Sequence, residues 1–121
     1  MLSEGARRLL REAISSVWAL ELLLLIRKEP ERGFTLDGLV RELRANRPLV
    51  GTIIAKFKER GLVVEAGDIV RYAPVSTDIG SAVTEIQSVY AQTPLALIKE
   101  IADAPNEKIQ AFADAFKLKR D

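Results

Sequence analysis

The chain has 121 residues, of which 48% are hydrophobic and 29% are charged, and its formal net charge is +1. This length is enough to bury one core of ordinary size, so we expect a single domain that spans residues 1–121. Because the sequence has no cysteine and no histidine, it excludes disulfides, zinc sites built on thiolate or imidazole, and nucleophiles or acid–base groups of these two types.

The N-terminal segment, residues 1–30, is predicted to be helical. Up to Lys28 it has no proline, and its composition favours one long helix or two helices joined at Ser15-Ser16. Residues 17–26 are apolar except for Glu21, so a helix here must lie beneath the next module, between two subunits, or both. Since this run is far shorter than the roughly 20 residues that cross a bilayer, we expect no membrane segment. The absence of a signal-peptide pattern favours the cytoplasm.

The central segment, residues 34–74, begins with the pattern of two short amphipathic helices that meet across a tight turn. Thr35 can cap the first helix, and the second follows Ala45-Asn46. Their apolar residues recur with the helical period: Leu36, Leu39, Val40 and Leu43 in the first, and Val50, Ile53, Ile54 and Phe57 in the second. Gly61 is expected to end the second helix. Two β-rich runs, residues 62–65 and 69–72, then flank a turn at Ala66-Gly67-Asp68, which predicts a β-hairpin.

The C-terminal segment, residues 76–121, returns to a helical pattern. Ser76 can cap a helix over about residues 77–92, and Thr93-Pro94 starts another that Ala104-Pro105 ends. Asn106 can cap a last helix. The apolar face of the first of these helices consists of Ile79, Val83, Ile86 and Tyr90. The apolar face of the last helix consists of Ile109, Phe112, Ala113 and Phe116.

The order of these elements resembles the winged helix-turn-helix superfamily of bacterial transcriptional regulators, with the MarR-like and PadR-like groups closest in layout. The resemblance is carried by Thr35 to Leu43, by Val50-x-x-Ile53-Ile54-x-x-Phe57, and by Lys58-Glu59-Arg60-Gly61-Leu62-Val63. The expected fold is therefore mainly α with a small β-hairpin: a winged helix-turn-helix with flanking N- and C-terminal helices. The resemblance implies that a recognition helix, about residues 47–60, enters the major groove of double-stranded DNA while the hairpin, or wing, touches the adjacent backbone or minor groove.

Positive charge gathers in the helix-turn-helix, since residues 41–60 hold six basic and two acidic side chains. Such a patch suits phosphate contact, although the same charges would also suit an ordinary solvated surface. Arg47 is placed for a bidentate guanine contact, Thr52 for a base edge or thymine methyl, and Lys56 for guanine or phosphate. The full set of candidate DNA-binding residues is Arg44, Arg47, Thr52, Lys56, Lys58 and Arg71.

Two features of this module fit DNA binding less well. The hairpin tip carries Glu65 and Asp68, where basic residues would suit phosphate better. Gly51 lowers the helix propensity by about 1 kcal/mol relative to alanine, so it either permits close approach of a ligand or is merely tolerated.

We predict a DNA-binding transcriptional regulator that is not an enzyme, needs no cofactor and acts as a homodimer. A dimer would cover the apolar surface that one module leaves over and would place two recognition helices about one DNA turn apart. The candidate interface residues are Leu23, Ile86, Tyr90, Phe112 and Phe116. Two alternatives stay open: a winged helix that binds a protein partner without sequence-specific DNA binding, and a regulator that senses a small molecule between its long helices.

Overall fold

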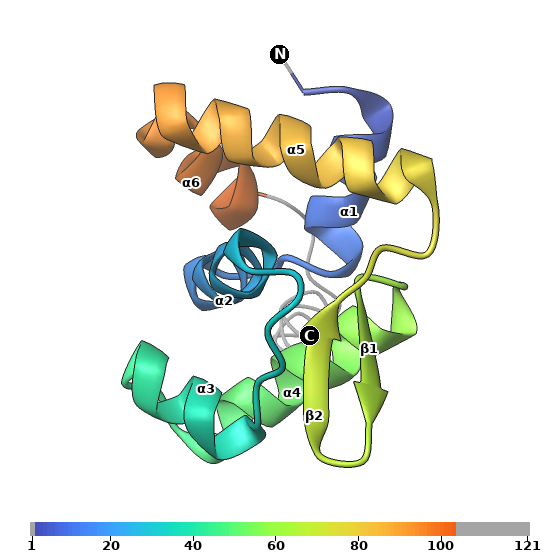
Figure 1. The fold of residues 1–121 in the computed structure, drawn as a ribbon. Helices are drawn as coiled ribbons and strands as arrows, with labels where there is room; N and C mark the ends of the chain where they lie inside the picture. Colours follow the sequence, from blue (N-terminus) through green and yellow to red (C-terminus); the bar gives the residue numbers. More distant parts are fainter. Residues whose placement is uncertain (1, 104–121) are drawn as a thin grey trace, which may run out of the picture.

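The computed structural model describes residues 2–103, which form six α-helices and one two-stranded antiparallel sheet (Figure 1). In chain order the elements are α1 (Glu4–Glu12), α2 (Val17–Lys28), α3 (Leu36–Leu43), α4 (Arg47–Glu59), β1 (Val63–Ala66), β2 (Ile69–Tyr72), α5 (Thr77–Gln92) and α6 (Pro94–Asp103). The predicted class, mainly α with a small hairpin, is confirmed. The last predicted helix, with Phe112 and Phe116, lies outside the described residues.

Five of the helices begin at a polar side chain that accepts a hydrogen bond from a backbone N–H of the first turn. These N-caps are Ser3, Ser16, Thr35, Asn46 and Ser76. The caps predicted at Thr35 and Ser76 are confirmed. The cap at Ser16 decides between the two N-terminal alternatives, because α1 ends at Glu12 and a separate helix begins at Val17.

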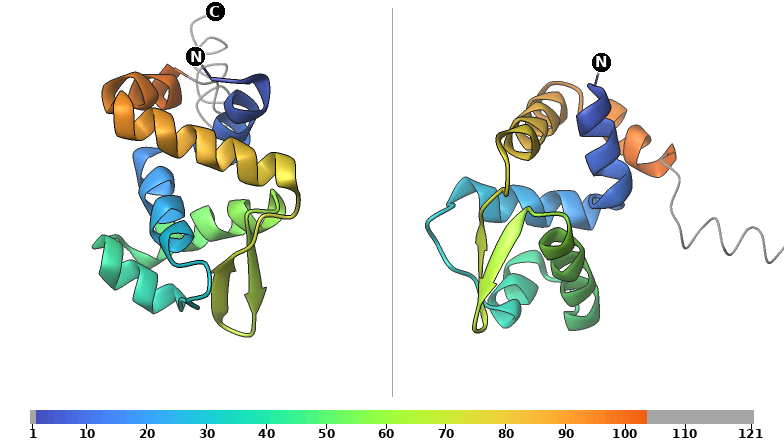
Figure 2. Two further views of the ribbon diagram at one scale, coloured as in Figure 1. Left: turned by 45° about the horizontal axis from the view of Figure 1, so that its top comes forward. Right: turned by 90° about the vertical axis from the view of Figure 1, so that its right-hand side faces the viewer.

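Helix α2 runs through the middle of the molecule, with α1, α5 and α6 on one side and α3, α4 and the hairpin on the other (Figure 1, Figure 2). Its buried residues are Ala19, Leu20, Leu22, Leu23 and Ile26. They belong to one contiguous core to which every helix contributes. The nearly uniform apolar surface of this helix is therefore covered mostly by its own chain. Within residues 2–103, no helix is both long enough and apolar enough to span a membrane.

The hairpin pairs Val63 with Tyr72 and Ala66 with Ile69, so its turn is Gly67-Asp68. The strand was predicted one residue early, because the N–H of Leu62 donates to the carbonyl of Phe57 and closes α4 instead of entering the sheet. A third segment joins the sheet at one residue, since Phe34 and Val70 exchange two backbone hydrogen bonds of 2.9 and 2.8 Å. This bridge ties the segment before α3 to β2.

Candidate nucleic-acid interface

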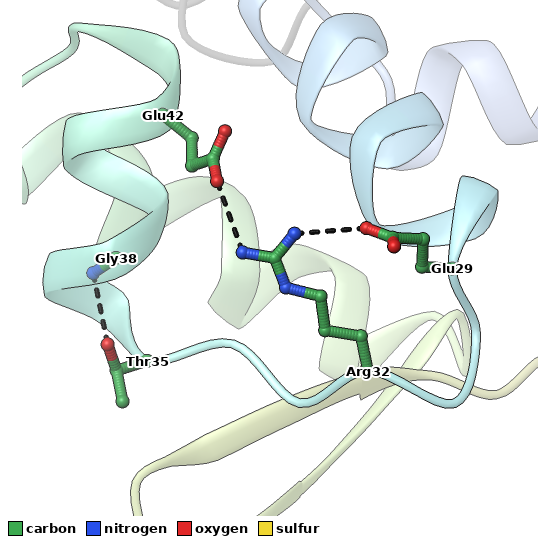
Figure 3. Close-up of polar contacts among 5 residues, drawn as sticks. All are labelled: Glu29, Arg32, Thr35, Gly38 and Glu42. Carbon is green, nitrogen blue, oxygen red and sulfur yellow. Dashed lines mark hydrogen bonds and ion pairs between the residues drawn. The ribbon is translucent and has the colours of Figure 1, made fainter.

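Polar contacts of Arg32 and Thr35 hold the segment between α2 and α3 (Figure 3). The guanidinium of Arg32 donates to Glu29 at 3.0 Å and to Glu42 at 3.1 Å, and so connects the end of α2 to α3. These hydrogen bonds to two carboxylates raise the pKa of Arg32 above its usual value. The same guanidinium lies 4.3 Å from the centre of the Phe34 ring. Thr35 then caps α3 by accepting a 3.0 Å hydrogen bond from the N–H of Gly38.

Helix α4 buries one face and leaves the other open. The predicted inward residues Val50, Ile53, Ile54 and Phe57 are all buried, which confirms the helical pattern read from the sequence. On the opposite side Arg47, Pro48, Thr52 and Ala55 are exposed, while Gly51 and Lys56 are half-buried. The Thr52 hydroxyl donates to the Pro48 carbonyl at 2.9 Å, so it is turned back along its own helix.

Gly51 lies in open space on this helix. A Cβ atom added at Gly51 would meet no atom within 4 Å. Close packing inside the chain therefore gives no reason for glycine at this position.

Acidic residues from other segments neutralise part of the positive charge that the sequence concentrates in the helix-turn-helix. Three of the six basic residues pair with acids that lie outside residues 41–60: Arg47 with Asp37, Lys58 with Glu65 at 2.6 Å, and Arg60 with Glu12 at 3.9 Å. The other three, Arg41, Arg44 and Lys56, make no ion pair with any residue that the structure describes. The sequence window counted the cations but missed these partners, because two precede the window and one follows it.

The hairpin contributes one basic side chain to the candidate set. Arg71 is exposed on β2, where its guanidinium lies beside the backbone of Gly33. At the tip, Glu65 is engaged by Lys58 and Asp68 is exposed. Lys58 therefore connects α4 to the hairpin, and its predicted contact with DNA stays a prediction.

The predicted dimer interface needs correction. Leu23 and Ile86 have no exposed surface in the single chain, so neither side chain can meet a partner. Tyr90 is half-buried, and its hydroxyl donates to Glu21 at 2.8 Å, a bond that raises the tyrosine pKa. Phe112 and Phe116 lie beyond the described part of the chain. The large apolar side chains that are exposed are instead Val17, Trp18, Val64, Val75 and Leu95.

An open surface pocket of about 740 Å³ lies where α2, β2 and α5 meet. Arg27 and Tyr72 line it together with the first two turns of α5, and Arg27 donates to Thr84 at 2.8 Å and to Gln87. Burial raises the pKa of Tyr72, against a smaller opposite effect of Arg27. Among residues 2–103 there is no group of three His, Cys, Asp or Glu side chains placed to hold a metal ion.

Comparison with known proteins gave no match, whether to a family model, to a curated protein or to a solved structure.

Proposed function

We propose that residues 34–72 form a winged helix-turn-helix that binds double-stranded DNA, with α4 as the recognition helix. The observation that carries this proposal is the exposure of α4: its four apolar residues are buried, whereas its opposite face is exposed at Arg47, Pro48, Thr52 and Ala55. A helix of this kind, held on a short helix and followed by a hairpin, fits the major groove.

The side chains around the open face divide into groups with different roles. Arg47 is at the start of α4, and its ion pair with Asp37 is exposed on both sides, at 62% and 72% of the side-chain surfaces. Exposed ion pairs contribute little to stability, so Arg47 can exchange Asp37 for a guanine or a phosphate. Arg41 and Lys56 are free of such pairs within the described residues and are assigned to phosphate contact.

We further propose that the protein acts as a homodimer in transcriptional regulation. The exposed apolar side chains Trp18 on α2 and Leu95 on α6, at 44% and 80% exposure, offer surface that a second copy would cover. A two-fold dimer would present two copies of α4 to a palindromic site.

A second candidate function is the binding of a protein partner through the hairpin. The observation that favours it is Val64 on β1, which is 53% exposed next to an acidic tip that would repel phosphate. The two functions differ in their response to salt and to the loss of a cation on α4.

Binding of a fluorescent random-sequence duplex at about 50 and 200 mM salt tests the proposal. If three cations of each subunit meet phosphates in a dimer, the slope of log K against log salt is about −5, and affinity falls about a thousandfold over this range. Lys56→Ala is expected to weaken binding, whereas the control Arg11→Ala, which removes an exposed cation from α1, leaves it unchanged. Absence of binding at 50 mM salt would refute DNA binding and favour the protein partner.

A further inference from the structure

Helices α3 and α4 end in the same hydrogen-bonded motif. At the end of α3, the N–H of Ala45 donates to Val40 at 3.2 Å and the N–H of Arg44 donates to Arg41 at 3.3 Å. At the end of α4, the N–H of Leu62 donates to Phe57 at 2.9 Å and the N–H of Gly61 donates to Lys58 at 3.2 Å. Both pairs form the Schellman closure, in which the residue just past the helix adopts a left-handed backbone.

The two helices place different residues at this left-handed position. Gly61 has φ +72°, which glycine adopts without steric cost. Arg44 has φ +54°, and it is the one residue other than glycine with positive φ among those that the structure describes. An L side chain is disfavoured there because its Cβ crowds the following carbonyl oxygen. Glycine at residue 44 would close α3 with less strain.

Glycine would allow the same closing hydrogen bonds, and no contact of the Arg44 side chain within the described chain explains why arginine is present instead. Arg44 is exposed, and its guanidinium has no hydrogen bond and no ion pair with any residue from 2 to 103. Arg44 is close to the start of α4 along the chain, since Asn46, the N-cap of α4, follows it by two residues. Residue 44 therefore lies close to the end of α4 that the proposed function places at the groove.

We infer that Arg44 is a phosphate-binding residue whose side chain is kept at the expense of local stability. Its ligand is a phosphodiester of the DNA backbone beside the start of α4, which the planar guanidinium can bind through two parallel N–H donors. Strained backbone at an exposed residue is a recognised mark of a functional site. This inference rests on the proposed function, because it assigns one contact within that interface.

Three substitutions of Arg44 separate the effect of its positive charge on DNA binding from the effect of its left-handed backbone on stability. Arg44→Gly is expected to raise the melting temperature by about 2–5 °C, since it relieves the strain although it adds freedom to the unfolded chain. It should weaken duplex binding by about tenfold for each contacting subunit and make the salt slope shallower by about one per subunit. Arg44→Asn, which tolerates positive φ, should lose the same affinity. Arg44→Lys keeps the charge, so it should keep the salt slope, but it loses the two parallel donors and should keep only part of the affinity.

The matched control is Arg11→Gln, which removes one exposed positive charge from α1 and should alter neither the binding nor the slope by as much. If the wild type binds and both Arg44→Gly and Arg44→Asn bind equally well with the same slope, the phosphate assignment is overturned while DNA binding stands. A lower melting temperature for Arg44→Gly would overturn the claim that stability is given up at this position. If the wild type binds no duplex at low salt, the proposed function fails, and the assignment of Arg44 fails with it.

Discussion

The two halves of α4 differ in how they are held. The C-terminal half is connected to the rest of the chain: Lys58 pairs with Glu65 of the hairpin, Arg60 pairs with Glu12 of α1, and Gly61 packs directly against Val75. The N-terminal half follows a strained turn at Arg44 and exposes Pro48 and Thr52, and the ion pair that it makes, Arg47 with Asp37, is exposed on both sides. One helix thus separates residues that stabilise the module from residues that are free to meet a ligand.

This comparison predicts unequal effects for two basic residues of the same helix. Arg47→Ala should weaken duplex binding by about 1–3 kcal/mol if it meets a base edge, because the contact is bidentate. Lys58→Ala removes an equal charge, but the pair of Lys58 with Glu65 is less exposed than the pair of Arg47 with Asp37, at 46% and 32% against 62% and 72% of the side-chain surfaces. We expect it to change binding by less than about 0.5 kcal/mol. Fluorescence anisotropy at fixed salt measures both, and equal losses would show that the two halves do not differ in function.

The next largest effect is expected at Gly61. Alanine there must keep φ near +72°, and its Cβ would lie 2.5 Å from the Cγ1 of Val75. The backbone strain and the crowding together should lower the free energy of unfolding by about 2 kcal/mol. Urea denaturation measures this loss.

The double variant Gly61→Ala/Val75→Ala separates the two causes. Removing the Val75 methyl groups, which are largely exposed, should recover only the part of the loss due to crowding. Full recovery would mean that the left-handed backbone costs little at this position. The contrast drawn with Arg44 would then lose its basis.

The sequence predicted the parts of this module that depend on local periodicity. Apolar residues three and four apart report which side of a helix is buried, and Val50, Ile53, Ile54 and Phe57 are buried as predicted. The pattern does not report what covers an apolar face, which is why Leu23 and Ile86 were assigned to a dimer although their own chain buries them. Ion pairs between distant segments, such as Arg60 with Glu12, have no local signal at all.

Two other features of the structure were not predicted, one because it is too short to form a sequence pattern and one because a helix ends without the expected glycine. Phe34 forms a bridge of a single residue, which alternation of polar and apolar residues cannot reveal. A helix end is expected at glycine, and the sequence offered none between Gly38 and Gly51. The left-handed Arg44 was therefore proposed as a DNA contact for its charge alone, and its strained backbone became visible only in the structure.

The smallest expected effect tests why the open half of α4 contains Gly51. Alanine at this position should raise the free energy of unfolding by about 0.5–1 kcal/mol, because alanine favours the helix and the added Cβ meets no atom within 4 Å. The same change should weaken duplex binding if the glycine admits a DNA strand to close contact. Gly5→Ala in α1 is the control, since its Cβ also meets nothing and it lies outside the proposed interface. A variant that gains stability and keeps full affinity would mean that Gly51 is merely tolerated, and that α4 does not approach DNA closely at this residue.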